Sequence, residues 1–509
     1  MMWPTLACLS LLLLPSSATT MHSCPTVKTH TNIEMHTYPD AEYTVEQSEY
    51  WSTACSALKP SCIVYPKTAR EVAEMVHIIN DIENNDHFAV KSGGHNPNNY
   101  FASIKDGPLI STKKLDQVKL DDKTGQVRVG PGNRWDDVAE KLNGSGWTVV
   151  GGRIGNVGVG GYMLGGGLSF LSQQYGWAVS SIIEMEVVLP NGTIVTTSRS
   201  KHPDLFKVLR GGGNAFGIVT SYLLQGYKQG QVWGGTLIFQ HSNETDAKLL
   251  AAMRDFTQHN KDNKAAIILT AQRTAKSLGS LDMWTLFVFY DGPTPPAGTF
   301  DSFTDAHPTL NTAKTQSYSD LLNANNAFVA KGSIFTIGTE TVPLPMKAFG
   351  KKVLGDMHEY WRNVSAPIVD TVANAIVVQG YQPFPKRMAR ISRERGRDLI
   401  DMDDSIDRII IELNYAYTSK SDAKKVDKAM KKNYKGIRSQ VLKDQDNGML
   451  PRGYLPLFMN DAYHAQDYFS RLRPENRELA RKVAEKVDPK GLFRDYTGGF
   501  KPRKAMKTM

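Results

Sequence analysis

Two glycine-rich segments set the strongest constraint on how this chain can fold. The first is Ser92-Gly93-Gly94-His95-Asn96, which follows a strand-like stretch at residues 88–91. In the second, six of the ten residues from position 158 to position 167 are glycine. Glycine reaches positive φ without steric cost, and its missing Cβ lets main-chain N–H groups approach a phosphate closely. Two such segments predict a backbone that lies against something large, flat and phosphorylated.

A third glycine cluster at residues 211–219 strengthens this interpretation. Each cluster alone could be an ordinary tight turn, but the three together are hard to explain that way. The usual dinucleotide fingerprint is absent, because Met163 stands where the third glycine after Gly158 and Gly160 belongs. A Rossmann dehydrogenase is therefore disfavoured, and a flavin held by several loops is favoured.

His95 adds a chemical group to the first glycine segment. A lone histidine is more often a structural hydrogen-bonding residue than a reactive one. Here Gly93 and Gly94 hold it on a turn, and a neutral imidazole is available near the reference pKa of about 6.5. The sequence therefore predicts a covalent bond between His95 and the flavin.

The first residues read as a secretory signal peptide. Residues 6–14 form a short apolar core, and residues 15–18 supply small residues for cleavage after Ala18. This core is too short to cross a bilayer of about 30 Å, so no membrane association is expected. We expect a secreted protein, and four Asn-x-Ser/Thr triplets, at Asn143, Asn191, Asn243 and Asn363, are then candidate glycosylation sites.

Three cysteines follow the signal. In an oxidising compartment, one disulfide among Cys24, Cys55 and Cys62 is expected, with one thiol left over. The spacing leaves the pairing open.

The chain has 509 residues, more than one hydrophobic core usually serves, so two lobes are expected. The net charge of +9 raises the question of nucleic-acid binding. However, the basic stretch 386–397 is followed at once by an acidic stretch at 398–407, which is typical of a solvated face of mixed sign. We expect no nucleic-acid partner, no metal site and a monomer.

Residues 57–228 alternate short strands and helices after an N-terminal segment at residues 19–56. Apolar residues at helical spacing predict a helix over residues 69–82. Turn residues at 121–125 and 190–192 predict two hairpins. Strands are expected at residues 63–65, 88–91, 118–120, 127–129, 183–189 and 194–196, with a short helix at 135–142. This pattern indicates a mixed α/β lobe.

Residues 229–446 form a second lobe with longer strands. Strands are expected at residues 235–240, 265–270, 284–290, 376–379 and 409–417, and helices at 245–259, 346–361 and 421–440. Strands in bulk with helices to one side predict an α+β layer. Residues 447–499, within the C-terminal segment 447–509, differ from both lobes through four prolines, at 451, 456, 474 and 489.

At this point the chain resembles a known family, the FAD-linked oxidases of the berberine bridge enzyme type within the vanillyl-alcohol oxidase superfamily. The matching segments are residues 92–95, 156–167, 211–220, 457–462 and 487–493. The resemblance implies an α+β fold of two lobes: a PCMH-type FAD-binding domain at residues 57–228 and an antiparallel-sheet substrate domain at residues 229–446. It also implies that the segment 447–509 returns to cover the cofactor.

The resemblance also implies which residues bind FAD. His95 looks like the histidine that bonds to the flavin 8α carbon. The residues expected to contact FAD are Ser92, Gly93, Gly94, His95, Asn96, Val157, Gly158, Gly160, Gly161, Gly165, Gly217, Ile218, Val219 and Asn460.

Four positions bear on how this chain differs from its family. Ile154 stands where many relatives carry a cysteine, which implies a single tether and a smaller, more enclosed substrate. Phe458 replaces a tyrosine that often serves as base, and phenylalanine cannot take a proton. Tyr162 replaces a common histidine beside the flavin. Val157 matches the position where a small side chain admits oxygen, which favours oxidase over dehydrogenase chemistry.

A catalytic base must then come from elsewhere. On the strand 409–417, Tyr415 shares one face with Ile411 and Leu413, and Glu412 and Asn414 share the other. Tyr415 could act on substrate if its face looks toward the flavin ring, or it is merely core if that face looks toward the helices.

Gln379 and Gln382 are further pocket candidates, with surface positions as the alternative. The predicted catalytic set is therefore Tyr415, Gln379, Tyr162 and Val157.

The sequence thus predicts a secreted flavoprotein that oxidises a small organic molecule, such as a secondary metabolite, by hydride transfer, with O2 as electron acceptor. Three alternatives stay open. They are an oxidative cyclase of natural-product synthesis, a carbohydrate oxidase, and a secreted protein that binds flavin without turnover.

Overall fold

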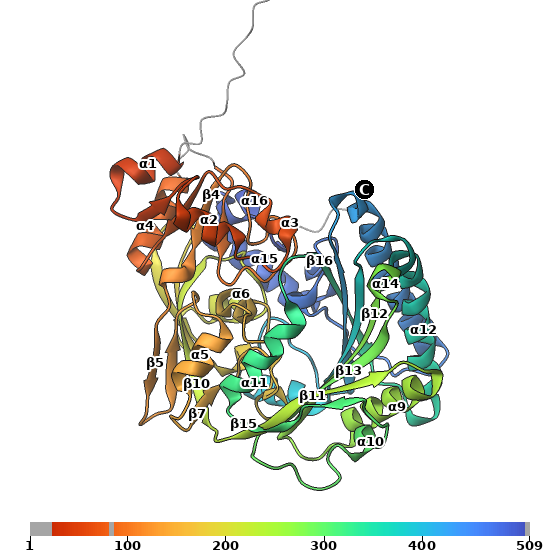
Figure 1. The fold of residues 1–509 in the computed structure, drawn as a ribbon. Helices are drawn as coiled ribbons and strands as arrows, with labels where there is room; N and C mark the ends of the chain where they lie inside the picture. Colours follow the sequence, from red (N-terminus) through yellow and green to blue (C-terminus); the bar gives the residue numbers. More distant parts are fainter. Residues whose placement is uncertain (1–22, 81–85, 504–509) are drawn as a thin grey trace, which may run out of the picture.

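The computed structural model describes residues 23–80 and 86–503 of the 509-residue chain. The predicted signal peptide at residues 1–18 lies outside them. Three sheets organise the molecule, and Figure 1 shows the two smaller ones on one side and the largest on the other. The α+β fold class expected from the sequence is confirmed, with a largest sheet that is antiparallel throughout.

The first sheet carries the first glycine loop. Its strands are β1 (Glu34–His36), β2 (Cys62–Tyr65), β3 (Ala89–Lys91) and β4 (Pro108–Ser111), in the order β1-β2-β4-β3. Strands β2, β4 and β3 are parallel, and the amphipathic helix α4 (Ala69–Asn80) connects β2 to the following strand. The loop with His95 begins directly after β3, so the sheet edge fixes where that loop starts.

A disulfide ties the N-terminal segment to this sheet. Cys24 in α1 (Ser23–His30) bonds to Cys62 in β2, and Cys55 in α3 (Thr53–Ser56) is free and buried. The expected single disulfide is confirmed, and the structure resolves the pairing that the sequence left open.

The second sheet has six strands and carries the other two glycine loops. It consists of β5 (Val118–Asp121), β6 (Gln126–Val129), β10 (Ile218–Lys228), β8 (Ile182–Val188) and β9 (Ile194–Ser198) in that order, with β7 (Trp147–Val149) paired to β10. The pairs β5–β6 and β8–β9 are the two predicted hairpins. Helix α5 (Trp135–Leu142) precedes the second glycine loop, and the short helix α6 (Val159–Leu164) lies within it.

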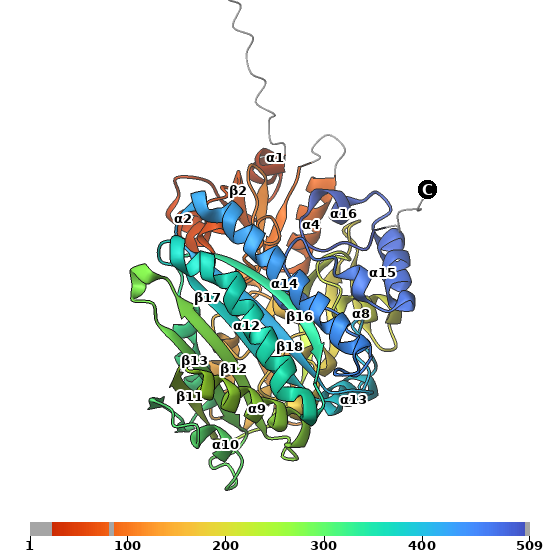
Figure 2. The same cartoon turned by 90° about the vertical axis from the view of Figure 1, so that its right-hand side faces the viewer.

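The third sheet has eight antiparallel strands. They are β11 (Val232–Gln240), β12 (Ala265–Thr274), β13 (Asp282–Tyr290), β14 (Leu310–Asn311), β15 (Lys314–Gln316), β16 (Ile334–Pro343), β17 (Ile376–Phe384) and β18 (Arg408–Tyr417). Figure 2 shows helices α9 (Asn243–His259), α12 (Lys347–Thr371) and α14 (Ala423–Asp446) covering one face of this sheet. Its other face looks toward the two smaller sheets (Figure 1).

The C-terminal segment returns to the first lobe, as expected. Helices α15 (Pro474–Val487) and α16 (Leu492–Tyr496) lie beside the first lobe in Figures 1 and 2. The Phe88 main-chain N–H donates to the Tyr496 carbonyl at 2.9 Å, and the ring of Phe493 contacts Phe88 edge to face. The last described residues therefore pack against the sheet that carries the His95 loop.

Most predicted elements of the core are confirmed to within a few residues, and the main omissions have clear reasons. Strand β16 was not predicted, because its polar residues Thr336, Thr339 and Thr341 interrupt an apolar alternation. Helix α12 runs past its predicted end at residue 361 and continues through Pro367 to Thr371.

Among the described residues, no helix is long and apolar enough to span a membrane.

The remaining described helices are short or peripheral. They are α2 (Ala41–Ser48), α7 (Ser172–Tyr175), α8 (Pro203–Leu209), α10 (Asp301–Thr304), α11 (Tyr318–Asn325) and α13 (Lys386–Glu394), with 3₁₀ turns η4 (Asn326–Val329) and η6 (Met459–Asp461) near the site.

Candidate active site

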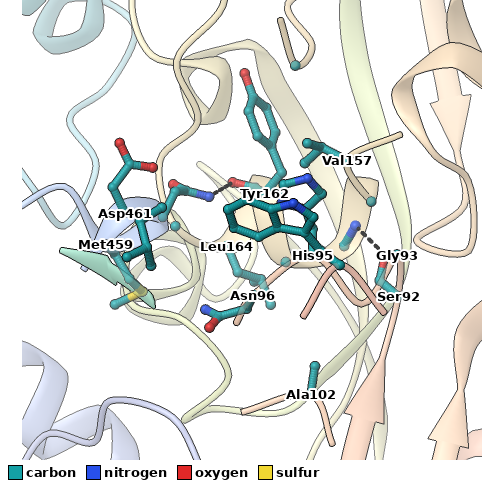
Figure 3. A pocket seen from close by; sticks show the side chains of 18 of the residues that line it. Ser92, Gly93, His95, Asn96, Ala102, Val157, Tyr162, Leu164, Met459 and Asp461 are labelled. Atoms are coloured by element: carbon teal, nitrogen blue, oxygen red, sulfur yellow. Dashed lines mark hydrogen bonds between the residues drawn. The ribbon is translucent and has the colours of Figure 1, made fainter. Parts of the chain in front are cut away.

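One cavity of about 390 Å³ lies where the three sheets and the C-terminal segment meet. Such a volume falls in the range of small-molecule sites. All of the residues predicted to contact FAD line it, from Ser92 in the first loop to Asn460 in η6. Figure 3 shows Met459 and Asp461 on one side of the cavity and Ser92 and Gly93 on the other. The structure thus brings the predicted loops together, and their role toward FAD stays a prediction.

The first two glycine loops pack against each other through their main chains. A Cβ atom on Gly93 would lie 2.5 Å from the main-chain nitrogen of Gly158, and one on Gly158 would lie 2.2 Å from the nitrogen of Gly93. The Ser92 hydroxyl accepts from the Gly160 N–H at 3.1 Å, the contact drawn in Figure 3. Glycine is required at these two positions because any side chain would separate the loops.

Gly161 differs from its neighbours. A Cβ built on it meets no atom within 4 Å, although the residue lines the cavity. Its missing side chain therefore leaves open space at the cavity wall, the kind of cradle in which main-chain groups can face a ligand.

His95 lies deep in the protein at the edge of the cavity. Burial, reinforced by the charge of Arg134, lowers the pKa of His95 to about 3, so the imidazole is neutral at any ordinary pH. Its Nε2 atom is enclosed and has no hydrogen-bond partner among the residues that the structure describes. A neutral ring nitrogen without a hydrogen-bond partner, at the wall of a cavity, is available to act as a nucleophile.

Asn460 connects the C-terminal segment to the second glycine loop. Its side-chain oxygen accepts from the Gly167 N–H at 3.2 Å, and its side-chain nitrogen donates to the Tyr162 carbonyl at 3.2 Å. A Cβ on Gly165 would lie only 2.5 Å from the Asn460 side-chain oxygen. The amide thus fixes the turn at residues 165–167 and carries Asp461 into the cavity wall.

Tyr415 does not reach the cavity, so its predicted catalytic role is wrong. The side chain is fully buried on the helical side of the sheet. Its hydroxyl accepts from the Asn433 amide in α14 at 3.1 Å and lies 3.5 Å from the Ser365 hydroxyl in α12. The alternative stated from the sequence is confirmed: this face of β18 is core. Glu412 and Asn414, on the opposite face, line the cavity instead.

Gln379 is also misplaced by the sequence prediction. It is fully buried on the helical side, where its side-chain oxygen accepts from the Tyr381 hydroxyl at 3.1 Å. Gln382 lies at odd spacing from Gln379 on β17 and therefore on the opposite face. Its amide donates to the Asp461 carboxylate at 2.9 Å, and its oxygen accepts from Arg153. Gln382, not Gln379, belongs to the site.

Tyr162 lines the cavity with its ring but not with its hydroxyl. The hydroxyl donates to the Gly151 carbonyl at 2.9 Å, and burial raises the pKa of Tyr162 well above its ordinary value. Figure 3 shows the side chain directed away from His95. The hydroxyl proton is therefore held in the wall, and the place of Tyr162 in the predicted catalytic set stays a prediction. Val157 lines the cavity as expected.

Two carboxyl groups face the cavity together, and the sequence reasoning did not assign either of them. Glu412 comes from β18 and Asp461 from η6, and both line the cavity. Burial, together with the charge of Glu412, raises the pKa of Asp461 to about 8. Burial also raises the pKa of Glu412. In both groups burial favours the neutral form, and for Asp461 the charge of Glu412 adds to this effect.

A signal for this pair was present in the sequence. Glu412 is the one charged residue between Ile409 and Tyr417, in a strand whose remaining residues are apolar or aromatic apart from Asn414. Burying a charge is costly, so its presence there indicates a function. Asp461 lies inside the matching segment 457–462, and Arg153 lies three residues before the matching segment 156–167. Arg153 lines the cavity and donates to Gln382, which connects it to Asp461.

The sheet floor of the cavity has a polar row with a gap in it. Thr285, Thr270, Gly380 and Glu412 are consecutive cross-strand partners on β13, β12, β17 and β18. A Cβ on Gly380 would lie 3.4 Å from Glu412 Cβ and 3.8 Å from the Thr270 hydroxyl. Gly380 therefore leaves a notch, one side chain wide, between a hydroxyl and a carboxyl group. Apolar residues surround this row: Ile268, Phe287, Phe328, Val329, Ile337 and Val378.

The residues present fit a bound FAD. The glycine loops supply close-packed main chain, Gly161 faces open space, and His95 presents an unpartnered neutral nitrogen. Gly217, Ile218 and Val219 extend the same wall along the start of β10.

Comparison with known proteins places these features in context. A family model described as an FAD binding domain matches residues 60–198. The chain is 38% identical over 471 residues to an uncharacterized FAD-linked oxidoreductase of Arthroderma benhamiae, covering 92% of each protein. It is 30% identical over 461 residues to the FAD-dependent monooxygenase tpcD of Cochliobolus heterostrophus, covering 89% of this chain and 86% of that protein.

The fold also matches solved structures. The chain superposes on 6-hydroxy-D-nicotine oxidase of Arthrobacter nicotinovorans with a TM-score of 0.73 at 20% identity, covering 93% of this chain and 98% of that one. At this identity the match bears on the fold alone.

Proposed function

Because the chain belongs to the FAD-linked oxidoreductases of the berberine bridge enzyme type, we propose that it oxidises a small organic molecule at the cavity wall formed by β18. The observation that carries this proposal is the meeting of His95, the glycine loops and the Glu412–Asp461 pair at one cavity. The proposed substrate is a compound of secondary metabolism with a removable hydride on a carbon bearing oxygen or nitrogen. O2 is the proposed electron acceptor and leaves as hydrogen peroxide.

FAD, when bound here, supplies the two-electron acceptor, and the protein supplies position and electrostatics. His95 would hold it covalently through a single bond, and the main chain of the glycine loops would face its phosphates. Ile154 and Val157 would border the remaining space. Val157 is small enough to leave room for O2, which supports the choice of oxidase over dehydrogenase.

Glu412 is the proposed base. It lies on the substrate side of the sheet, beside the Gly380 notch, where an O–H or N–H of the substrate can reach it. General bases work best when their pKa lies near the working pH, and burial has moved the pKa of Glu412 in that direction. Asp461 is the second carboxyl group at this wall, and Gln382, anchored by Arg153, orients it through a hydrogen bond.

The enclosed, largely apolar floor supports a small substrate and not an oligosaccharide. The name of the Cochliobolus relative favours one second candidate, a monooxygenase. Product mass separates the candidates: oxidation removes two hydrogens, oxygenation adds an oxygen atom, and oxidative cyclisation removes two hydrogens while closing a ring.

The first test is a visible spectrum taken before and after acid precipitation. Yellow colour that stays in the pellet of the wild type and leaves it in His95→Ala supports the tether. Peroxide release is then screened against small alcohols, amines and phenols. A colourless protein that takes up no FAD overturns the proposal, and a bound flavin that no substrate reduces leaves only the non-catalytic alternative.

We also propose that the protein is exported. The signal peptide lies outside the described residues, so support comes from the Cys24–Cys62 disulfide, which is typical of oxidising compartments. Asn143, Asn191 and Asn243 are exposed and available for glycosylation. Recovery of the protein from culture medium, with a mass that falls on deglycosylation, tests this.

A further inference from the structure

The loop that carries His95 is held by a short segment of the N-terminal region, residues 49–55. The Trp51 main-chain N–H donates to the Gly94 carbonyl at 3.1 Å. Gly94 has φ +65°, and a Cβ on it would lie 2.8 Å from the Glu49 carbonyl oxygen and 3.0 Å from the Tyr50 ring. The two segments are therefore in direct main-chain contact at the residue before His95.

The same segment also holds the loop after His95. The Cys55 thiol lies 3.4 Å from the Pro97 carbonyl and 3.4 Å from the Asn99 side-chain oxygen. Burial raises the pKa of Cys55 to about 12, so the group stays a neutral thiol that can donate. The main chain on both sides of His95 is thus fixed by one segment.

The indole of Trp51 fixes the imidazole itself. The two rings are stacked, with centroids 4.6 Å apart and planes 16° from parallel. On its other face, Trp51 stacks on Phe335 of β16 at 4.1 Å and 19°. Trp51 is 5% exposed and lines the cavity beside His95. Because Phe335 supports Trp51, the indole face leaves the imidazole little freedom to rotate out of its plane.

Strand β16 anchors this stack. The Phe335 N–H donates to the Ser52 hydroxyl at 3.1 Å, and the Thr53 N–H donates to the Ser333 carbonyl at 2.9 Å. The plane of the His95 ring is therefore set by the eight-stranded sheet, through Trp51, and not only by its own loop. Nε2 makes no hydrogen bond with a described residue, although the Asn156 side chain lies near enough to act on the ring.

We propose that Trp51 is the positioning residue for covalent attachment of the flavin: its indole face holds the His95 imidazole in the plane from which a ring nitrogen reaches the 8α methyl carbon. This rests on the proposed tether at His95. In the net reaction one C–N bond forms, the imidazole ring and the methyl carbon each lose one proton, and O2 takes up both protons and the two released electrons as hydrogen peroxide. Trp51 takes no part in these bonds.

The test compares the fraction of flavin that stays with acid-precipitated protein in Trp51→Phe, Trp51→Leu and wild type. Small errors in the position of reacting groups cost up to about 100-fold in rate, so we expect Trp51→Leu to lower covalent attachment by about tenfold or more. Its flavin should still bind and be released by acid. Trp51→Phe keeps a stacking face and should retain most of the attachment.

Controls separate this role from general stability and from the tether itself. Trp233→Leu removes a stacked tryptophan at Phe300, away from the cavity residues, and should leave attachment unchanged. Wild-type attachment in Trp51→Leu would overturn the proposal, whereas acid-labile flavin in the wild type would overturn the tether itself. If Trp51→Leu does not fold, Phe335→Leu decides: reduced attachment supports the stack, and wild-type attachment overturns it.

Discussion

The two faces of the eight-stranded sheet are built from the same strands, but one packs against helices and the other lines the cavity. On β18, Ile411, Leu413 and Tyr415 are fully buried against helices α12 and α14. Glu412 and Asn414, which alternate with these residues along the strand, point to the other face and line the cavity. Period-two alternation makes both faces from one short sequence.

On the helical face a few polar atoms, such as Gln379 Nε2 and Asn433 Oδ1, lack a hydrogen-bond partner among the described residues, but the carboxylate of Asp246 is paired. Asp246 of α9 accepts from the Trp284 indole at 2.6 Å and lies 2.9 Å from the His241 ring. The cavity face does the reverse: it encloses two carboxyl groups whose pKa values are raised because neither is fully compensated. Such a departure from packing rules is typical of a functional site. The two faces therefore differ in how their carboxyl groups are paired: the pKa of Asp246 is lowered to about 2, whereas the pKa values of Glu412 and Asp461 are raised.

Among substitutions that test the difference between the two faces, we expect replacement of Glu412 on the cavity face to have the largest effect on activity. Glu412→Gln keeps the shape of the side chain but removes the base, so kcat should fall on the order of 10²–10⁴-fold. The bound-flavin spectrum and the melting temperature should stay near wild type. Peroxide release under saturating substrate measures the loss. Full activity in this variant would remove Glu412 from the mechanism.

The next effect concerns stability and pH. The pKa of Asp461 is raised from its ordinary 3.8 to about 8, so between these values the folded protein holds a proton that the unfolded chain lacks. Stability from this group is therefore lost as pH rises through that window. In the Asp461→Asn variant this side chain cannot ionise. The loss of unfolding free energy between about pH 5 and about pH 8 should therefore be smaller than in the wild type by a few kcal/mol. Urea denaturation at both pH values tests this, and an unchanged slope contradicts it.

Two glycines on opposite faces give a matched pair. Gly380 faces the cavity, and Gly380→Val would fill the notch, so KM should rise about tenfold with little change in stability. Gly338 faces α14, where a Cβ would lie 2.6 Å from the Met430 sulfur. Gly338→Ala should leave KM unchanged and cost about 1–3 kcal/mol of stability. Equal effects of the two variants on KM would show that the faces are not separate.

The smallest effect is expected at Tyr415. Tyr415→Phe removes a hydroxyl that accepts from Asn433, which should cost about 1 kcal/mol of stability. Activity should not change, because the hydroxyl lies on the far side of the sheet from the cavity. Thermal unfolding and steady-state kinetics of the purified variant measure the two quantities. A loss of activity without loss of stability would restore Tyr415 as a catalytic candidate.

Much of the site could be located from the sequence because glycine leaves a local signature. The loops around Gly93, Gly158 and Gly217 were placed correctly at one cavity, since close main-chain packing permits no other residue. The prediction of the catalytic residues was less accurate. Tyr415 and Gln379 were chosen from residue type, and type alone does not say which face of a strand meets helices and which meets a ligand.

The sequence by itself determined the glycine loops, the histidine between them, and the alternation that gives β18 two unlike faces. These follow from backbone sterics and side-chain period, which act within a few residues. Only the tertiary structure decided that Cys24 pairs with Cys62, that Asp461 lies beside Glu412, and that Trp51 stacks on His95. Each of these joins segments far apart in the chain, because the packing of layers, and not any local pattern, decides which segments meet.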